Sequence, residues 1–530
     1  MAKQKSKSEA EESNRMWASA SFVGVLIIIG LPLWWKTTEV YRVSLPFDKI
    51  SSFDTLPHLI TTELTVLAND ESTAADIVGL IEKTFEDSDV IQVKITKSII
   101  PKQLHSTLDS VADEQEAMEE VAAAFNLTRH NHFYVVQRKP LFQDVWLAGE
   151  RVLFFRDAKA STTIVEVLNS VVYQTSTLEG AQSEVADEAR QIRFPPGAGY
   201  HIVLSVVHPS PDTMNVELDA GEAVEDFIGS FVDELSVLHN FTLKSQWLYL
   251  LDFDFQGKEV KDSSEWGRHV SVRSERLPLL LTKLEERSAT HVSDLPTLNL
   301  ALYAVRCRDA PLAIYDHNDK KIPTSVQAFL SPKWGGVVLG SPGAADCRRH
   351  ACWRPNVRLI MGTFISQLRQ LLGITEPDHI KGAHLEPLRS VTPRQWEIDN
   401  LLRIRTLEQV TSAERTLQSL AQLLGEISNI VINDEVGASI NSAVDSIQQA
   451  SQLMIKGDLV EAYRMSQSAF QAAETAFMEP SLLALLYFPD DQKYAIYIPL
   501  FLPIMFPVVL SLKNLLLWFR GKPIHKEKAD

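Results

Sequence analysis

The hydrophobic positions of this chain predict alternating strands and helices over most of its length. Between about residues 60 and 340, short apolar runs typical of strands alternate with stretches whose apolar residues recur every three or four positions. This alternation predicts an α/β body. The expected strands are Glu63–Leu67, Val90–Ile95, Phe133–Val136, Val152–Phe155, Ile202–Val207, Trp247–Leu251, Leu298–Val305, Leu312–Tyr315 and Gly335–Leu339. The expected helices are Thr73–Phe85, Ser106–Phe125, Thr162–Val172 and Ala223–Leu238, with surface loops at Leu178–Gly199 and Gln256–Arg276.

From about Gln395 the pattern becomes helical throughout. Apolar residues recur at spacings of three and four from Val410 to Ile427, from Val436 to Ile447 and from Leu459 to Phe477. Gly457 followed by Asp458 indicates the end of one helix and the cap of the next. The pattern predicts a helical hairpin or bundle after the α/β body.

Two long uncharged runs flank these regions. Met16–Trp35 holds twenty residues, and as a helix it would span ~30 Å, the thickness of the hydrocarbon core of a bilayer. Tryptophans lie at both of its edges, as is typical of the lipid–water boundary. A cleaved signal peptide is the alternative, but no A-x-A-type site follows the run, which favours an uncleaved anchor.

The second run, residues 494–519, contains Pro499, Pro503 and Pro507 at every fourth position, near one helix face. Each proline removes a backbone donor and clashes with the preceding turn, so we expect a bent helix. In lipid the freed carbonyls need partners. Two interpretations stay open: a kinked span that tolerates its prolines, or a span that docks against the transmembrane helices of a partner.

Basic residues adjoin the outer ends of both runs, which by the positive-inside rule predicts two cytosolic tails and a lumenal body. Asn126 and Asn240 begin N-x-S/T sequons in that body, the side on which glycosylation occurs. The predicted divisions are a cytosolic tail 1–15, a transmembrane helix 16–35, a lumenal α/β domain 36–392, a lumenal helical region 393–480, a second transmembrane helix 494–519 and a cytosolic tail 520–530.

Charge and the C-terminal tail refine the class of protein. The chain has 530 residues, 51 Lys and Arg against 68 Asp and Glu, and a net charge of −17, with no basic cluster in the body, which argues against nucleic-acid binding. Lys526 and Lys528, near the C-terminus, resemble the dilysine signal that returns membrane proteins to the endoplasmic reticulum. A solvated basic tail beside anionic lipid is the alternative.

The three cysteines suggest a disulfide rather than a metal site. Cys347, His350 and Cys352 lie within six residues, but structural zinc needs a fourth ligand and different spacing. In an oxidising compartment a Cys347–Cys352 disulfide is favoured, which leaves Cys307 free. A Cys–His catalytic pair is a further alternative, although no nucleophile signature surrounds any cysteine.

Other candidate chemistry is sparse. Asp252 and Asp254 form a D-x-D that could bind a divalent ion on a nucleotide sugar, as in lumenal glycosyltransferases. The same residues also fit strand alternation with both carboxylates on the solvent face. His130-Asn131-His132 is interpreted as a polar surface pair of histidines. No P-loop, nucleophile elbow, zincin or dinucleotide fingerprint occurs, so we predict no catalytic, cofactor-binding or metal-binding residues and no cofactor.

Four stretches resemble the PIG-S family, whose members are subunits of the glycosylphosphatidylinositol (GPI) transamidase complex. They are Gly30–Glu39 (GLPLWWKTTE), Ser331–Gly336 (SPKWGG), Ser419–Val431 (SLAQLLGEISNIV) and, nearly residue for residue, Leu485–Pro503 (LLYFPDDQKYAIYIPLFLP). The resemblance extends from the first span to the second, with residues 70–195 the most divergent.

The resemblance implies a function in the endoplasmic reticulum membrane. The complex replaces the C-terminal signal of precursor proteins with a GPI anchor, and its implied Cys–His nucleophile belongs to a separate subunit. This chain would then be a non-catalytic structural subunit whose partners are of the PIG-K, PIG-T, PIG-U and GPAA1 types. The alternatives are a metal-dependent glycosyltransferase acting on a lipid-linked sugar through Asp252 and Asp254, and a generic tether of the endoplasmic reticulum.

Overall fold

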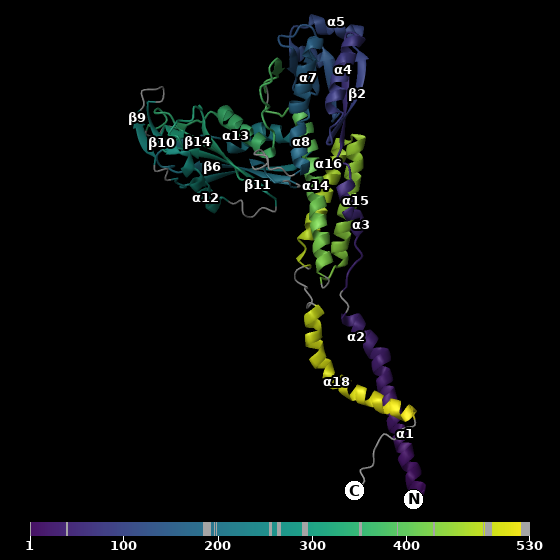
Figure 1. Ribbon diagram of the computed structural model, residues 1–530. Coiled ribbons are helices and arrows are strands. Elements are labelled where there is room, and N and C mark those ends of the chain that lie inside the picture. The colour runs from purple at the N-terminus through teal and green to yellow at the C-terminus, as the bar shows by residue number, and fades with distance from the viewer. Residues whose placement is uncertain are drawn as a thin grey trace. The chain divides into compact units, whose positions relative to one another are not determined.

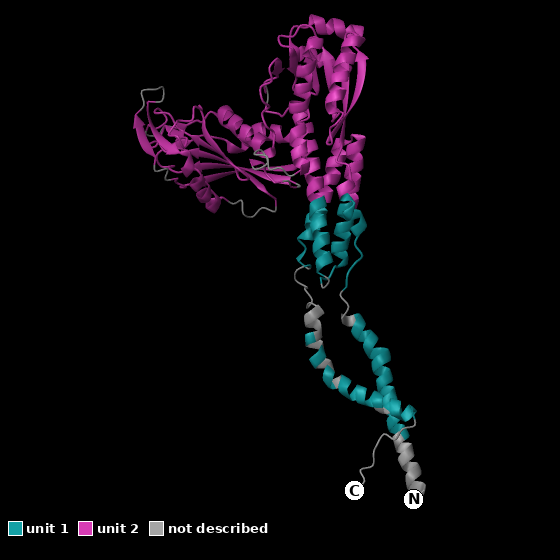
Figure 2. Cartoon of the chain, in the orientation of Figure 1, with its two compact units in different colours: residues 1–53, 414–444, 471–530 teal, residues 54–413, 445–470 magenta. Residues whose placement is uncertain are grey.

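The computed structural model describes residues 2–38, 41–183, 192–195, 197, 199–253, 257–261, 267–288, 295–348, 352–388, 391–427, 430–480, 482 and 490–520. The chain divides into two compact units, which Figure 2 shows in different colours. Residues 1–53, 414–444 and 471–530 form the first unit, and residues 54–413 and 445–470 form the second.

The second unit contains a six-stranded sheet in the order β16-β4-β5-β3-β1-β2. All neighbouring strands are parallel except β4 and β5. The strands are β1 (Ile60–Ala68), β2 (Ile91–Ile99), β3 (His132–Gln137), β4 (Val145–Leu147), β5 (Val152–Phe155) and β16 (Ala383–Leu385). The inner strands are buried almost continuously, as expected of a parallel sheet that is covered on both faces.

Helices cover both faces of this sheet. In β1, Val66 faces a core that contains Ile77 of α4 and Ile164 of α7, whereas the next residue, Leu67, faces a core that contains Leu108 of α5. This two-residue alternation places one hydrophobic core on each side of the sheet. The helical elements here are α4 (Glu71–Phe85), α5 (Lys102–Ser110), α6 (Glu114–Ala124), η3 (Ala158–Ala160), α7 (Ser161–Val167), η4 (Leu168–Val172) and α8 (Thr175–Ser183).

A second sheet in the same unit has five strands in the order β13-β14-β11-β6-β8, parallel except for β13. Its strands are β6 (Gly199–His208), β8 (Asn240–Tyr249), β11 (Thr297–Ala304), β13 (Gln327–Ser331) and β14 (Gly335–Gly340). Its helical elements are α10 (Ala220–Ala223), η5 (Val224–Gly229), α11 (Ser230–Glu234) and α13 (Val357–Leu372). Figure 1 shows both sheets and the helices that accompany them.

Smaller elements complete this unit. β9 (Lys258–Lys261), β10 (Arg268–Arg273) and β12 (Leu312–Tyr315) form a three-stranded sheet, and β7 (Asn215–Val216) pairs with β15 (Cys352–Trp353). The short helices η6 (Ser274–Arg276) and α12 (Pro278–Arg287) follow β10. The α/β body is therefore confirmed, and each of the nine expected strands overlaps an observed one.

Three local predictions were wrong. The expected loop Leu178–Gly199 begins inside α8, which continues to Ser183. The expected loop over 256–276 contains β9 and β10, because a short strand of mainly charged residues lacks an apolar signal but still completes a ladder. The expected helix Ser106–Phe125 is two helices. The chain becomes extended at Val111 and at Asp113, and α6 begins after Asp113.

Three long helices follow the sheets: α14 (Gln395–Glu426), α15 (Asp434–Lys456) and α16 (Leu459–Phe477). The apolar stripes expected from their spacing are buried, including Leu417, Val444 and Tyr463, which confirms the helical region. Gly457 adopts a left-handed φ of 86° between α15 and α16, the conformation expected after a helix end.

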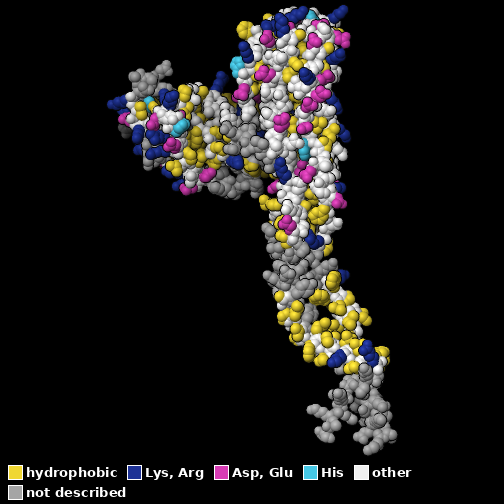
Figure 3. All heavy atoms as spheres, viewed as in Figure 1, with side chains coloured by type: hydrophobic (Ala, Val, Ile, Leu, Met, Phe, Trp, Pro, Cys, Tyr) yellow, Lys and Arg dark blue, Asp and Glu magenta, His cyan; other side chains and the backbone are white. Residues whose placement is uncertain are grey.

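The first unit contains the apolar helices at the two ends of the chain. They are α1 (Ala2–Val25), the π-turn η1 (Leu26–Gly30), α2 (Leu31–Thr38) and α18 (Asp490–Phe519), and the short helices α3 (Phe47–Ser51) and η2 (Phe53–Thr55) follow α2 in the chain. Hydrophobic side chains dominate the visible surface of these end helices in Figure 3. Within the described residues, Ser13–Lys36 is apolar and long enough to cross a membrane, whereas the apolar part of α18, Met505–Phe519, is shorter.

Candidate functional site

Asp252, the first residue of the D-x-D pair, lies three residues after the end of β8. The Asp252 carboxylate forms an ion pair with the guanidinium of Arg306, which also contacts Asp309 at 3.2 Å. Asp254 lies outside the described residues. Among the residues that the structure describes, no three His, Cys, Asp or Glu side chains converge as metal ligands. Because its charge is matched by arginine, Asp252 acts here as an ion-pair partner, and nothing favours the glycosyltransferase interpretation.

The predicted cysteine pairing was wrong. Cys347 is bonded to Cys307, with their Cα atoms 5.5 Å apart, and Cys352 is free. Cys307 follows β11 directly, whereas Cys352 is held in β15 by its pairing with Asn215 of β7. Proximity in sequence therefore misled the prediction, because strand pairing holds Cys352 in place while the fold brings Cys307 to Cys347.

The free Cys352 thiol lacks the setting of a nucleophile. Its Sγ donates to Glu217 Oε2 at 3.5 Å. Partial burial, the hydrogen bond to Glu217 and the charge of that carboxylate raise the pKa of Cys352. Since the thiolate is the reactive species, this setting disfavours the reactive form of Cys352. His350 lies outside the described residues.

Both sequon asparagines are exposed. Asn126 follows α6, and its Oδ1 accepts hydrogen bonds from the backbone N–H and the hydroxyl of Thr128, at 3.1 and 2.7 Å. Asn240 is the first residue of β8. Glycosylation at either residue stays a prediction, since accessibility is a requirement for it and not evidence of it.

The three prolines of the second apolar run lie inside α18, and all three are exposed. α18 contacts α1 within the first unit. The face formed by Pro499, Pro503 and Pro507 is therefore accessible, as a docking face requires. Lys526 and Lys528 lie outside the described residues.

An ionic cluster that the sequence did not reveal lies between the first sheet and α14. The Asp399 carboxylate accepts from Arg151 Nε at 2.7 Å and Nη2 at 2.9 Å, and from the Asn131 backbone N–H at 3.1 Å. His130 Nδ1 lies 2.8 Å from the same carboxylate. Burial raises the pKa of Asp399, but the hydrogen bonds and charge of Arg151 outweigh this and hold that pKa well below its usual range.

The histidines of this segment are therefore not a surface pair. His130 contacts Asp399, and His132 stacks on Tyr134 with ring centroids 4.5 Å apart. Between them, Asn131 is buried at a left-handed φ of 62°, which asparagine tolerates better than most residues. Its amide donates to Thr61 O at 2.7 Å and to Gly457 O at 3.1 Å. The polar atoms of this segment therefore have a structural role.

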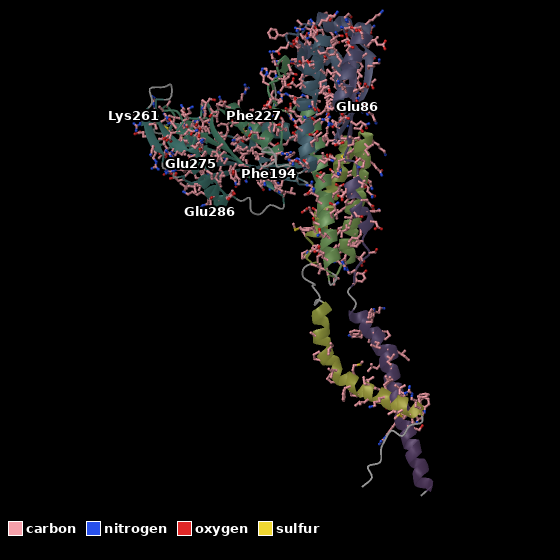
Figure 4. All side chains as sticks on the ribbon, in the orientation of Figure 1. Glu86, Phe194, Phe227, Lys261, Glu275 and Glu286 are labelled. Atoms are coloured by element: carbon pink, nitrogen blue, oxygen red, sulfur yellow. A yellow bond between two sulfur atoms is a disulfide. The ribbon has the colours of Figure 1, made fainter. Side chains whose placement is uncertain are left out.

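Different groups contact α14 from the segment before β6 and from the end of α13. Arg193 forms a buried ion pair with Glu408 at 3.1 Å. Arg405 donates to the backbone carbonyls of Phe194 and Leu372 at 3.4 and 3.2 Å, and Figure 4 labels Phe194. The first half of α14 is thus buried on all sides by polar contacts as well as apolar ones, which an amphipathic pattern does not predict.

A cavity of about 360 Å³ lies beside the start of α14. Its lining includes the carboxylates of Glu150, Glu234 and Glu386 and the apolar side chains of Met118 and Leu388. Burial raises the pKa of Glu150, opposed by Arg151 and aided by the other two carboxylates. Glu386 is held by the Gly149 N–H at 2.8 Å. Glu386 is itself among the buried charged residues.

Comparison with known proteins decides the family. The profile of the PIG-S family, "Phosphatidylinositol-glycan biosynthesis class S protein", matches residues 21–522. The chain belongs to the PIG-S family. It is 32% identical over 549 residues to the human GPI-anchor transamidase component PIGS, with 97% of each chain covered. It is 33% identical to the Bos taurus component and 23% identical to the PIG-S homolog of Schizosaccharomyces pombe. These alignments cover 97% and 86% of the two proteins.

The PIG-S resemblance in Ser331–Gly336 has a structural explanation. The segment is the turn between the antiparallel strands β13 and β14, with Lys333 at a φ of 58°. A Cβ at Gly335 would overlap the Asn299 carbonyl, and one at Gly336 would overlap the Gln367 side chain of α13. These glycines permit close packing of the turn and the helix. Of the other PIG-S-like stretches, Leu485–Pro489 lies outside the described residues.

Proposed function

We propose that this chain is a non-catalytic structural subunit of the GPI transamidase complex in the endoplasmic reticulum membrane. The complex replaces the C-terminal signal of precursor proteins with a GPI anchor. One observation carries the proposal: the chain matches named GPI-anchor transamidase components over 97% of its own length and of theirs. Such full-length correspondence favours the same role in the assembly over the reuse of a single domain.

A structural role is supported by the chemistry of the described side chains. The Cys352 thiol is held protonated beside Glu217, and Asp252 is paired with Arg306. The reactive residue would then belong to another subunit of the complex. The expected partners are subunits of the PIG-K, PIG-T, PIG-U and GPAA1 types.

The proposal includes a two-pass topology with both termini in the cytosol and the α/β body and helical region in the lumen. The basic flanks of both apolar segments and the exposed sequons at Asn126 and Asn240 support it. Peptide N-glycosidase should increase gel mobility, and this shift should shrink in N126Q and N240Q variants. An unshifted band, with both asparagines unmodified by mass spectrometry, would exclude the lumenal orientation.

Two finer features, a helix-docking face and a retrieval signal, belong to the same proposal. The proline face of α18 would dock against transmembrane helices of a partner, because its freed carbonyls need donors in lipid. Lys526 and Lys528 would act as a retrieval signal. Replacing both lysines by serine should release the chain to later secretory compartments, whereas K522S, a change in the same tail, should not.

The function is tested by purification of the tagged full-length chain in mild detergent, with mass spectrometry of the bound proteins. We expect near-stoichiometric recovery of a lumenal cysteine-protease-like subunit with several multispanning proteins. Cells that lack the endogenous chain should also lose a GPI-anchored surface reporter and regain it on expression of this one. Recovery of a well-folded chain alone, under conditions that preserve other membrane complexes, would overturn the proposal.

A further inference from the structure

The strand β8 (Asn240–Tyr249) is the long outer edge of the five-stranded sheet. It pairs with β6 over all ten of its residues, and no described strand pairs with its other side. Edge strands with unpaired backbone groups are sites at which another chain adds as a strand. Many proteins protect such edges by keeping the strand short, by placing charged side chains on it or by covering it. A long edge strand with no described partner therefore needs an explanation.

The register shows which backbone groups point outward. Leu250 N–H donates to His208 O of β6, and in a parallel ladder alternate residues turn both of their backbone groups to the same neighbour. The even-numbered residues of β8 therefore bond to β6. The odd-numbered residues direct their N–H and C=O groups away from the sheet, and these are Phe241, Leu243, Ser245, Trp247 and Tyr249.

The end of this strand also carries exposed apolar side chains. The rings of Trp247 and Tyr249 stack with centroids 5.8 Å apart, and Tyr249 is 57% exposed. Leu250 is 71% exposed and has a left-handed φ of 59°. This conformation is unfavourable for a bulky side chain, and such strain is concentrated at functional positions. Tyr249 and Leu250 thus expose apolar surface to water beside backbone groups that pair with no described strand.

The other long edge strand, β2, provides a contrast. It pairs with β1 over nine residues, but its exposed side chains include Lys94 and Lys97. Lysines on an edge are a common protection against strand addition. In β8 the one charged side chain is Lys244, and no lysine lies near the aromatic end. Of the two edges, β8 is the one that is suited to accept a strand.

We propose that the outer edge of β8 receives an extended segment from another subunit of the transamidase, with apolar side chains that pack on Tyr249 and Leu250. This proposal rests on the proposed function. A second copy of this chain is a poorer occupant, because antiparallel pairing of two β8 strands about Ser245 would make their Lys244 side chains diagonal neighbours on one face, where like charges repel. It would also place the sequon residue Asn240 opposite Leu250.

The test uses the full-length chain in the assembled complex. A photo-crosslinking amino acid at Lys244, which is exposed, should form an adduct with another subunit, whereas the same residue at the exposed Lys94 of β2 should form none. The variant S245P removes an outward N–H without breaking the bonds to β6. We expect it to lower recovery of the crosslinked subunit about tenfold, which corresponds to roughly 1.4 kcal/mol.

The matched control is K97P in β2. Because Ile100 N–H donates to Ala68 O, odd-numbered residues of β2 also direct their N–H outward. K97P should leave recovery unchanged. The crosslink at Lys244 needs no proline, so it tests the edge even where S245P fails to fold. No adduct, an adduct with a second copy of the chain, or full recovery with folded S245P would each overturn the proposal. A wild-type chain that recovers no subunit would overturn the proposed function itself.

Discussion

Two places in the second unit, one beside each large sheet, bury an ionisable side chain in opposite ways. Beside the first sheet, the Arg151 guanidinium donates to the buried carboxylate of Asp399, so each charge has an opposite charge as its partner. Near the second sheet, His239 is buried among Tyr200, Phe241 and Tyr463, and its Nδ1 lies 3.3 Å from the Tyr463 hydroxyl. Burial, with the charge of Arg405, lowers the pKa of His239 to about 3.

The difference shows when a buried ionisable group stays charged. Asp399 keeps its charge because Arg151 and neighbouring donors replace its lost hydration. His239 has hydroxyl and aromatic neighbours and stays neutral. The stability of the Asp399 site should therefore depend on its charged partner, and the stability of the His239 site should depend on pH.

The largest effect is expected at the paired site. Replacing Asp399 by Ala leaves the Arg151 guanidinium buried without its counter-charge, which should lower the free energy of unfolding by about 3–5 kcal/mol. Thermal unfolding of the full-length chain in detergent would measure the loss. The double variant R151M/D399L should recover most of it. If D399A is as stable as the wild type, Asp399 does not form the buried ion pair with Arg151.

The second prediction concerns pH. The folded pKa of His239, about 3, lies below its unfolded value of ~6.5, so between these values the unfolded state binds the extra proton. Stability should fall as pH falls through this range, by about 2 kcal/mol between pH 6.5 and 4.5, because the slope approaches roughly 1.4 kcal/mol per pH unit only below the unfolded pKa. Denaturation midpoints across this range would show the slope, and H239Q should reduce it. An equal slope in both proteins would contradict the neutral, buried histidine.

A smaller effect is expected at Tyr463, which donates to the Leu238 carbonyl at 2.7 Å in a buried site. Y463F should destabilise the chain by about 1–2 kcal/mol, because the carbonyl loses its donor without access to water. The matched control is Y41F, which removes an exposed hydrogen bond to Asp434. Equal changes in melting temperature for the two variants would argue against the role of burial.

The smallest effect is expected at an exposed ion pair. Arg273 contacts Asp319 at 3.0 Å, with both side chains more than half exposed. R273A should change the free energy of unfolding by less than about 1 kcal/mol. In R193A, by contrast, the buried Glu408 loses a partner and the loss should be several-fold larger. Chemical denaturation of both variants under one set of conditions would make the comparison.

Much of the architecture could be predicted because it depends on local periodicity. Apolar alternation located β1 and β6, and spacings of three and four located α14 and α16. The charged strands β9 and β10 were missed, since ladder bonds between backbone groups leave no hydrophobic signal. The site residues were harder still, because a carboxylate such as Asp252 has the same local sequence whether it binds a metal or an arginine.

By itself, the sequence determined the α/β body, the helical region, the apolar end segments and the family, because these follow from periodicity, run length and residue identity along the chain. The tertiary structure alone decided three things: the Cys307–Cys347 disulfide, the burial of Asp399 against Arg151, and the open edge of β8. The reason is the same in each case. Partners 40 residues apart for the disulfide and 248 residues apart for the ion pair are chosen by how sheets and helices pack, and no local pattern records that choice.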